Sequence, residues 1–299
     1  MRALMTGASG FIGSQLAILL AAKGVDVARI KHTALENVFA GIEKIIHVIR
    51  PDVVFHLAGT FQAAHASDML KANCLFAAKL LDAVKASGMG CQIILMGSAA
   101  EYGSVEESAL PIREDLTPRP ESLYGITKLS QTMIGLAFAG EGMDVVVARP
   151  FNVLGVGMSD FLAIPGFARQ LREIKSGNAP AVLKTGNLDT SRDFISVHSC
   201  VQALWLLAKE KGASGRIVNI CSGKAWSIRS IAERMIKMNG LLVRIEVDAG
   251  RIHRGDPHVN YGDPSLLHSL TGYMPGMTDL EMDEILASLL KYKSPHSHH

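Results

Sequence analysis

Tyr124 and Lys128 stand four residues apart, which places both side chains on one face if segment 124–128 is helical. A phenol beside an ammonium group is suited to proton transfer, because tyrosine titrates near ~10 and an adjacent cation favours its anion. Ser98 follows the apolar segment 92–96, and its hydroxyl could orient a substrate oxygen. These three side chains predict an enzyme whose proton donor is a tyrosine.

A glycine-rich turn near the N-terminus is typical of a dinucleotide site. Gly7, Gly10 and Gly13 follow a strand-like segment, 2–6, and precede a helix expected over 11–23. Strand, turn and helix in this order expose backbone N–H groups and a helix N-terminus to a pyrophosphate. We therefore expect a nucleotide cofactor here, in preference to a purely structural turn.

The residues after the second strand bear on the choice of cofactor. An NAD-binding chain usually has an acidic residue there, which holds the ribose 2′-hydroxyl. After the expected strand 25–30 this chain has Lys31 and His32, with Arg29 just before them, and no acid. Cations suit a 2′-phosphate, so the sequence favours NADP(H), with NAD(H) as the alternative if these are only solvated surface charges.

The elements that position these residues alternate between strand and helix, which predicts an α/β fold with a Rossmann-type doubly wound parallel sheet. Further strands are expected at 53–57, 92–96, 144–149, 181–184, 216–220 and 243–247, and further helices at 38–49, 68–87, 122–139, 165–175, 197–209, 228–239 and 279–290. We assign residues 1–157 and parts of 186–222 to a dinucleotide-binding domain, 158–185 and 223–292 to a smaller substrate-binding lobe, and 293–299 to a disordered tail.

Composition narrows the class of protein. The chain has 299 residues, of which 48% are hydrophobic and 19% charged, and a formal charge of +2. These values describe an ordinary globular protein and give no reason to expect nucleic-acid or membrane partners. The chain starts with a strand-like segment, so no signal peptide is expected. Four dispersed cysteines form no metal-binding or redox pair, so we expect reduced core residues, no metal and a cytoplasmic protein.

Further motifs carry a resemblance to a known family. They are Thr6 to Gly13, Ser98 with Tyr102-Gly103, Tyr124 with Lys128, Arg149-Pro150-Phe151-Asn152, Gly186-Asn187-Leu188, Arg192-Asp193-Phe194, 202–207 and Asn219 to Gly223. In this order they resemble the extended short-chain dehydrogenase/reductases that act on nucleotide sugars. The resemblance covers nearly the whole chain. It is nearest to the branch of GDP-mannose 4,6-dehydratases and GDP-4-keto-6-deoxymannose reductases.

The resemblance implies a role for each candidate residue. Ser98, Tyr124 and Lys128 are then catalytic. The cofactor contacts it implies are Gly7, Ser9, Gly10, Phe11, Ile12, Gly13, Lys31, His32, Leu57, Ala58, Gly59, Asn73, Tyr124, Lys128 and Phe151. The contacts it implies for a nucleotide-diphosphate sugar are Ser98, Ala99, Glu101, Asn152, Arg192 and Arg254, with Arg251 and His253 as alternatives to the last.

The type of reaction follows from what the motifs lack. In the family, a sugar 4,6-dehydratase has a Glu two residues before the tyrosine of the Tyr-Gly pair, often with an Asp before it, whereas this chain has Ala100 and Ala99. Glu101 comes one residue later and should point to the other side of an extended segment. We therefore expect an NADP(H)-dependent 4-ketoreductase of a GDP-linked 6-deoxy-4-keto sugar. A C4 epimerase, or a catalytically weak sensing or interaction protein, are the alternatives.

Two broadly apolar helices suggest self-association. Apolar residues occur all round the expected helix 68–87, and helix 122–139 is similarly apolar. Such width indicates burial on two sides. With the resemblance, it predicts a homodimer built through these two helices.

Overall fold

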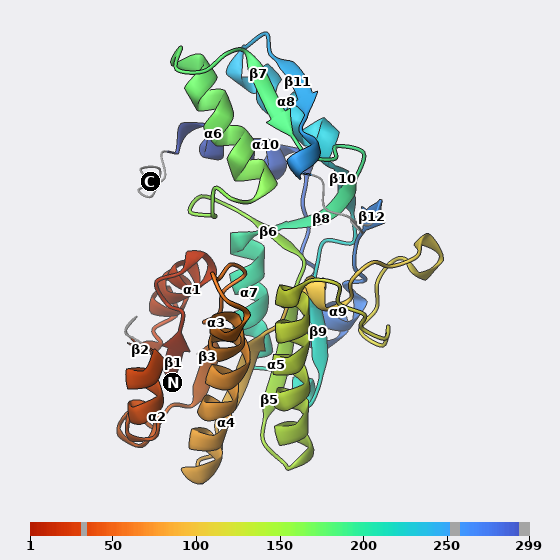
Figure 1. Ribbon diagram of the computed structural model, residues 1–299. Helices are drawn as coiled ribbons and strands as arrows, with labels where there is room; N and C mark the ends of the chain where they lie inside the picture. The colour runs from red at the N-terminus through yellow and green to blue at the C-terminus, as the bar shows by residue number, and fades with distance from the viewer. Residues whose placement is uncertain (31–34, 252–257, 293–299) are drawn as a thin grey trace.

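The protein is described by a computed structural model of residues 1–30, 35–251 and 258–292 (Figure 1). Its larger part is a six-stranded parallel sheet in the order β2-β1-β3-β4-β5-β9. The strands are β1 (Arg2–Thr6), β2 (Asp26–Arg29), β3 (Val53–His56), β4 (Gln92–Met96), β5 (Val145–Pro150) and β9 (Ile217–Ile220). The strand order reverses between β1 and β3, and open α/β sheets bind ligands beyond the carboxyl ends of the strands at such a point.

Helices cover both faces of this sheet, as the sequence predicts for a doubly wound fold. One face is covered by α1 (Phe11–Ala22), α7 (Val197–Leu207) and α9 (Ser265–Thr271), and the other by α2 (Leu35–Ile49), α4 (Phe76–Ala86) and α5 (Leu123–Gly140). The central strands β4 and β5 are buried on both sides, which explains their unbroken apolar sequences.

A smaller lobe with its own core lies beyond the carboxyl edge of the sheet (Figure 1). It consists of α6 (Ala163–Lys175), β7 (Val182–Thr185), α8 (Ile228–Asn239), β11 (Arg244–Val247) and α10 (Asp279–Lys291). Between the two cores, β8 (Ser191–Ser196) pairs with β6 (Asn152–Leu154), β10 (Ala225–Ser227) and β12 (Val259–Asn260). These four strands were not predicted, because three of them are short and each pairs with a segment distant in the sequence.

Two parts of the fold differ from the sequence prediction. The helix expected at 68–87 is α3 (Ala66–Leu70) and α4, joined by a π-helical segment, Lys71–Leu75. Helix α9, which the prediction includes in the smaller lobe, packs against the larger core, where Leu267 is fully buried. The sequence could not predict which core α9 packs against, because a helix of seven residues has too few apolar positions to indicate its partner.

The remaining composition-based expectations concern the cysteines and the membrane. All four cysteines are free, and Cys91, Cys200 and Cys221 are buried. Among the described residues, no helix combines the length and the apolar character that a membrane span requires. The expected tail, 293–299, lies outside the described residues.

Candidate active site

The glycine turn lies between β1 and the N-terminus of α1, next to the end of β3. Gly7 has a φ of +67°, and a Cβ there would lie 2.6 Å from the backbone nitrogen of Ala58. A Cβ on Gly13 would lie 2.1 Å from the Gly7 carbonyl oxygen. Gly10 begins α1 without a side-chain cap, and the first turn of α1 has no acidic residue. An uncapped helix N-terminus behind a close-packed glycine turn fits the pyrophosphate of a dinucleotide.

The other residues predicted in this turn divide between surface and core. Ser9 and Gly10 are exposed, whereas the Ile12 side chain packs against the larger core. The Phe11 ring packs against the smaller core and contacts Gly155. Phe11 and Ile12 therefore offer a cofactor their backbone, while their side chains join the turn to the two cores.

The end of β3 is held against β1 by a buried hydrogen-bond chain. Thr6 Oγ1 lies 2.9 Å from His56 Nδ1 and accepts a hydrogen bond of 3.1 Å from the backbone N–H of Ala58. Burial, with a smaller effect of Lys128, lowers the pKa of His56 to about 3, so this imidazole is neutral. His56 is therefore structural and fixes the loop that contains Leu57, Ala58 and Gly59.

Asn73 lies in the π-helical segment and braces that loop. Its Oδ1 accepts a bond of 2.8 Å from Thr60 N–H, and its Nδ2 donates to the Thr60 carbonyl and to Thr127 Oγ1. Asn73, which the resemblance implies as a cofactor contact, thus joins the loop after β3 to α5, and protein groups occupy both of its amide hydrogens.

Ser98 begins a single 3₁₀ turn, Ala99–Glu101, at the end of β4. Its hydroxyl accepts a hydrogen bond from Ala100 N–H, and its own N–H donates to Glu101 Oε1 at 2.8 Å. This reciprocal capping box fixes the backbone of Ser98. Ser98, Ala99 and Ala100 are half-buried, but Glu101 is fully buried.

Tyr124 and Lys128 lie in the first turns of α5, where the Ser122 hydroxyl caps the helix by accepting from Gly125 N–H at 3.0 Å. A Cβ on Gly125 would lie 2.4 Å from the Ala100 carbonyl oxygen, so glycine permits α5 to approach the Ser98 turn. The Ser98 side chain lies close enough to the Tyr124 hydroxyl to lower the pKa of that phenol. The structure thus brings the predicted serine and tyrosine together.

Lys128 points toward the cofactor side of the site. Its Nζ donates to Gln131 Oε1 at 2.8 Å, Gln131 donates to the Met96 carbonyl, and a Cβ on Gly59 would lie 4.0 Å from the Lys128 nitrogen. Burial lowers the pKa of Lys128 to about 8, although the Glu101 carboxylate opposes this change. Lys128 is therefore still mainly an ammonium at neutral pH.

The pKa of Tyr124 differs from the sequence expectation. Burial raises it above the ordinary value, the Ser98 hydrogen bond lowers it in part, and Glu101 raises it further. The expected lowering by Lys128 is not what this geometry gives, because the ammonium is directed to Gln131. A raised pKa keeps the phenol protonated, which suits a residue that donates a proton.

Two of the predicted substrate contacts, Asn152 and Arg192, lie on β6 and β8. The amide of Asn152, an exposed residue, donates to the Asp193 carbonyl at 2.8 Å, and the half-buried Arg192 donates to the carbonyl of Ser191. The two residues thus occupy neighbouring strands beyond the sheet edge. Lys31, His32, His253 and Arg254 lie outside the described residues, as does the side chain of Arg251.

Two predicted contacts are wrong for the side chain concerned. The Glu101 carboxylate cannot make the predicted contact with substrate, because it is fully buried against Arg149, Thr132 and the N–H of Ser98. Residues 99–101 form a 3₁₀ turn and not an extended segment, so the argument from strand alternation fails as well. The Phe151 ring is 6% exposed, in a cluster with Tyr102 and Ile112, and therefore does not face a cofactor.

The sequence interpretation named Asp193 and Arg149 only as parts of family motifs and assigned neither of them a role. The carboxylate of Asp193 accepts hydrogen bonds from the N–H groups of Ser222, Gly223 and Gly262, and from the Ser222 hydroxyl. It thereby holds the loop after β9 and the segment after β12 to β8. Burial, opposed by these bonds, raises its pKa to about 6. Arg149 did give a signal: a cation at the end of the apolar strand 145–148 requires a buried acid.

The Rossmann-type sheet, the glycine turn and the Ser98–Tyr124–Lys128 site are those of a dinucleotide-dependent enzyme, and sequence comparison gives its family. Residues 3–221 match the NAD dependent epimerase/dehydratase family, and the chain belongs to that family.

Its relatives include GDP-6-deoxy-D-mannose reductase of Pseudomonas aeruginosa, which is 34% identical over 286 residues, or 93% of each chain. GDP-6-deoxy-D-talose 4-dehydrogenase of Aggregatibacter actinomycetemcomitans is 27% identical and covers 91% of this chain and 92% of its own. Among solved structures, RMD from Pseudomonas aeruginosa complexed with NADPH superposes with a TM-score of 0.85 at 32% identity, covering 97% of this chain and 96% of that one.

Proposed function

We propose that the protein is an NADP(H)-dependent 4-ketoreductase of a GDP-linked 6-deoxy-4-keto-hexose. The observation that carries this proposal is the pair of Ser98 and Tyr124, brought together where α5 approaches the Ser98 turn, in which the one acid, Glu101, is buried. Ala99 and Ala100 supply no acid or base for the loss of water, so the pair serves a hydride and proton transfer at one carbon. The reductase and dehydrogenase relatives act on GDP-6-deoxy sugars according to their names, which supports the substrate class.

In the proposed reaction the 4-keto group accepts a hydride at carbon and a proton at oxygen. The reduced nicotinamide supplies the hydride. Ser98 donates a hydrogen bond to the carbonyl oxygen and orients it, while Tyr124, kept protonated by burial, gives its proton to that oxygen as the C4 alkoxide forms. Solvent then returns a proton to Tyr124. Lys128, whose Nζ lies next to Gly59, would hold the ribose of the cofactor when it is bound.

The choice of NADP(H) rests on two supports. The sequence has bases and no acid directly after β2, and the superposing RMD structure is a complex with NADPH. We further propose that the smaller lobe, with Asn152 and Arg192, binds the nucleotide diphosphate, because a guanidinium matches phosphate oxygens. Free cysteines suit a reducing compartment, and a cytoplasmic location is part of the proposal.

Incubation of the purified protein with GDP-4-keto-6-deoxymannose and NADPH tests the function. We expect loss of the nicotinamide absorbance in step with formation of the 4-hydroxy sugar, and weaker activity with NADH. No oxidation of NADPH would contradict the substrate. NAD that stays bound through purification, together with interconversion of 4-hydroxy epimers, would instead support the C4 epimerase.

We also propose a homodimer through the helical segment 68–87 and α5. Five large apolar side chains, between 41% and 58% exposed, lie on these elements: Leu70 in α3, Leu75 in the π-helical segment, and Leu123, Ile126 and Met133 in α5. We expect light scattering to give the mass of a dimer at micromolar concentration, and Met133→Glu to shift it toward the monomer. A monomeric wild-type protein would contradict this prediction.

A further inference from the structure

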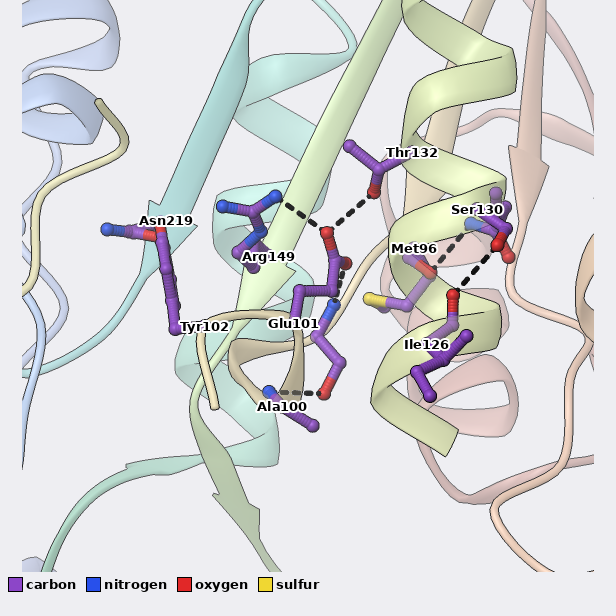
Figure 2. A network of polar contacts seen from close by, with 11 residues as sticks. Met96, Ala100, Glu101, Tyr102, Ile126, Ser130, Thr132, Arg149 and Asn219 are labelled. Atoms are coloured by element: carbon purple, nitrogen blue, oxygen red, sulfur yellow. Dashed lines mark hydrogen bonds and ion pairs between the residues drawn. The ribbon is translucent and has the colours of Figure 1, made fainter. Parts of the chain in front are cut away.

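Glu101 links three elements of the site through one buried carboxylate (Figure 2). Its Oε1 accepts from Ser98 N–H at 2.8 Å, at the end of β4. Its Oε2 accepts from Thr132 Oγ1 of α5 at 2.9 Å and from Arg149 Nη2 of β5 at 2.6 Å. The same group therefore contacts the turn that carries Ser98, the helix that carries Tyr124 and the sheet strand β5, which leads into β6.

The ion pair with Arg149 is completely enclosed. Both side chains are 0% exposed, and the guanidinium carbon lies 4.4 Å from the centre of the Tyr102 ring. The Tyr102 hydroxyl donates in turn to Asn219 Oδ1 at 2.8 Å. Nε and Nη1 of Arg149 have no hydrogen-bond partner among the described residues. Among the described residues, Glu101 is the only acid that forms an ion pair with Arg149, so each ion depends on the other.

Charge balance alone does not explain the position of the carboxylate. A partner for Arg149 needs only one oxygen, but Oε1 is turned away from the cation to Ser98. A Cβ on Gly97 would lie 2.7 Å from Oε1, so the glycine before Ser98 leaves the space that this contact requires. The acid also lies one residue beyond the place where a sugar dehydratase of this family has its Glu, which here is Ala100.

We propose that Glu101 is a positioning residue, whose carboxylate fixes the Ser98 hydroxyl against Tyr124 by holding the Ser98 backbone and α5 together. This inference rests on the proposed reductase function, since it assigns Glu101 a part in that reaction. It separates two roles for an acid in this turn. An acid one residue earlier, at position 100, acts as acid or base in a dehydratase. At position 101 the acid positions Ser98 and Tyr124, which take part in the reaction.

Two double variants that both remove the ion pair test the role. Glu101→Gln with Arg149→Met leaves an amide oxygen that can accept from Ser98 N–H, and Glu101→Leu with Arg149→Met leaves no acceptor. Replacing both members of a buried pair avoids an uncompensated charge. Because misplacement of a reacting group by about 1 Å can cost ~100-fold in rate, we expect kcat of the leucine variant to fall at least ~30-fold below that of the glutamine variant. The Kd for NADPH should be alike in both.

Equal kcat in the two variants, whether high or low, would overturn the inference, because charge neutralisation would then be the whole role of Glu101. Gly97→Ala provides the second test if the leucine variant does not fold. It displaces Oε1 from Ser98 while Glu101 and Arg149 both remain, and we expect kcat to fall about tenfold with little change in NADPH Kd. Wild-type kcat in a folded Gly97→Ala protein would also overturn the inference.

Failure of the proposed function remains distinguishable. If wild-type protein does not oxidise NADPH with the GDP-4-keto sugar, the substrate proposal fails. The contact between Glu101 and the Ser98 amide can then be tested by NMR without any measurement of activity. In ¹⁵N-serine-labelled protein, the Ser98 amide is the resonance that Ser98→Ala removes. Because hydrogen bonds to a carboxylate are strong, we expect it downfield in the wild type, shifted less in the glutamine variant and most in the leucine variant. An unchanged resonance in all three would refute the contact itself.

Discussion

Replacement of Tyr124 by phenylalanine is expected to lower kcat for the 4-keto sugar by about 100-fold to 10,000-fold, the range that a general acid contributes. The phenol is the proton donor in the proposed reaction, and its raised pKa keeps it protonated at neutral pH. The exchange removes one oxygen from a half-buried ring, so the fold and the Kd for NADPH should change little. Stopped-flow oxidation of NADPH and fluorescence titration of the cofactor measure the two quantities separately.

Tyr102→Phe is the matched control. This tyrosine lies next to the site, but its hydroxyl is buried and donates to Asn219, away from Ser98. Its removal leaves the Asn219 oxygen without that donor and should lower the free energy of unfolding by about 1–3 kcal/mol, while kcat stays within a few-fold. If Tyr124→Phe keeps wild-type kcat, the phenol takes no part in the chemistry. The non-enzymatic sensing or interaction role would then be the better hypothesis.

Gly13→Ala is expected to destabilise the protein by at least about 3 kcal/mol and to abolish measurable NADPH binding. Its Cβ would lie 2.1 Å from the Gly7 carbonyl oxygen and 2.9 Å from Ala8 Cα, both in the backbone, so α1 would have to move away from the turn. Overpacking of flexible side chains already costs about 1–3 kcal/mol, and here the neighbours cannot turn aside. Thermal unfolding with and without NADPH measures both effects.

Gly41→Ala is the control for this glycine. Gly41 lies inside α2, and a Cβ there would meet nothing within 4 Å. Alanine is the better helix former, so this variant should be more stable by about 0.5–1 kcal/mol and should bind NADPH like the wild type. A Gly13→Ala protein that unfolds at the wild-type temperature and still binds NADPH would show that the turn tolerates a side chain and does not seat the pyrophosphate closely.

The sequence alone determined the strands and helices that form the larger core, because each of them is specified by residues close together in the chain. The glycine turn, the apolar strands before Ser98 and Arg149, and the Ser122 cap before Tyr124 each fix an element through neighbouring residues. The alternation of these elements then specifies a doubly wound sheet, since right-handed crossovers leave few other arrangements. The candidates Ser98, Tyr124 and Lys128 follow, because residues after parallel strands and at helix starts meet at one edge of the sheet.

Only the tertiary structure decided what each polar group contacts. Strand β8 gains its identity from β6, β10 and β12, which lie far from it along the chain. Glu101 was predicted at the substrate, but it is buried because Arg149, 48 residues later, needs a charge partner inside the protein. The pKa of Tyr124 depends on burial and on the direction of the Lys128 ammonium, not on spacing. Sequence spacing placed the reacting residues together, whereas desolvation and distant partners decided their protonation and their support.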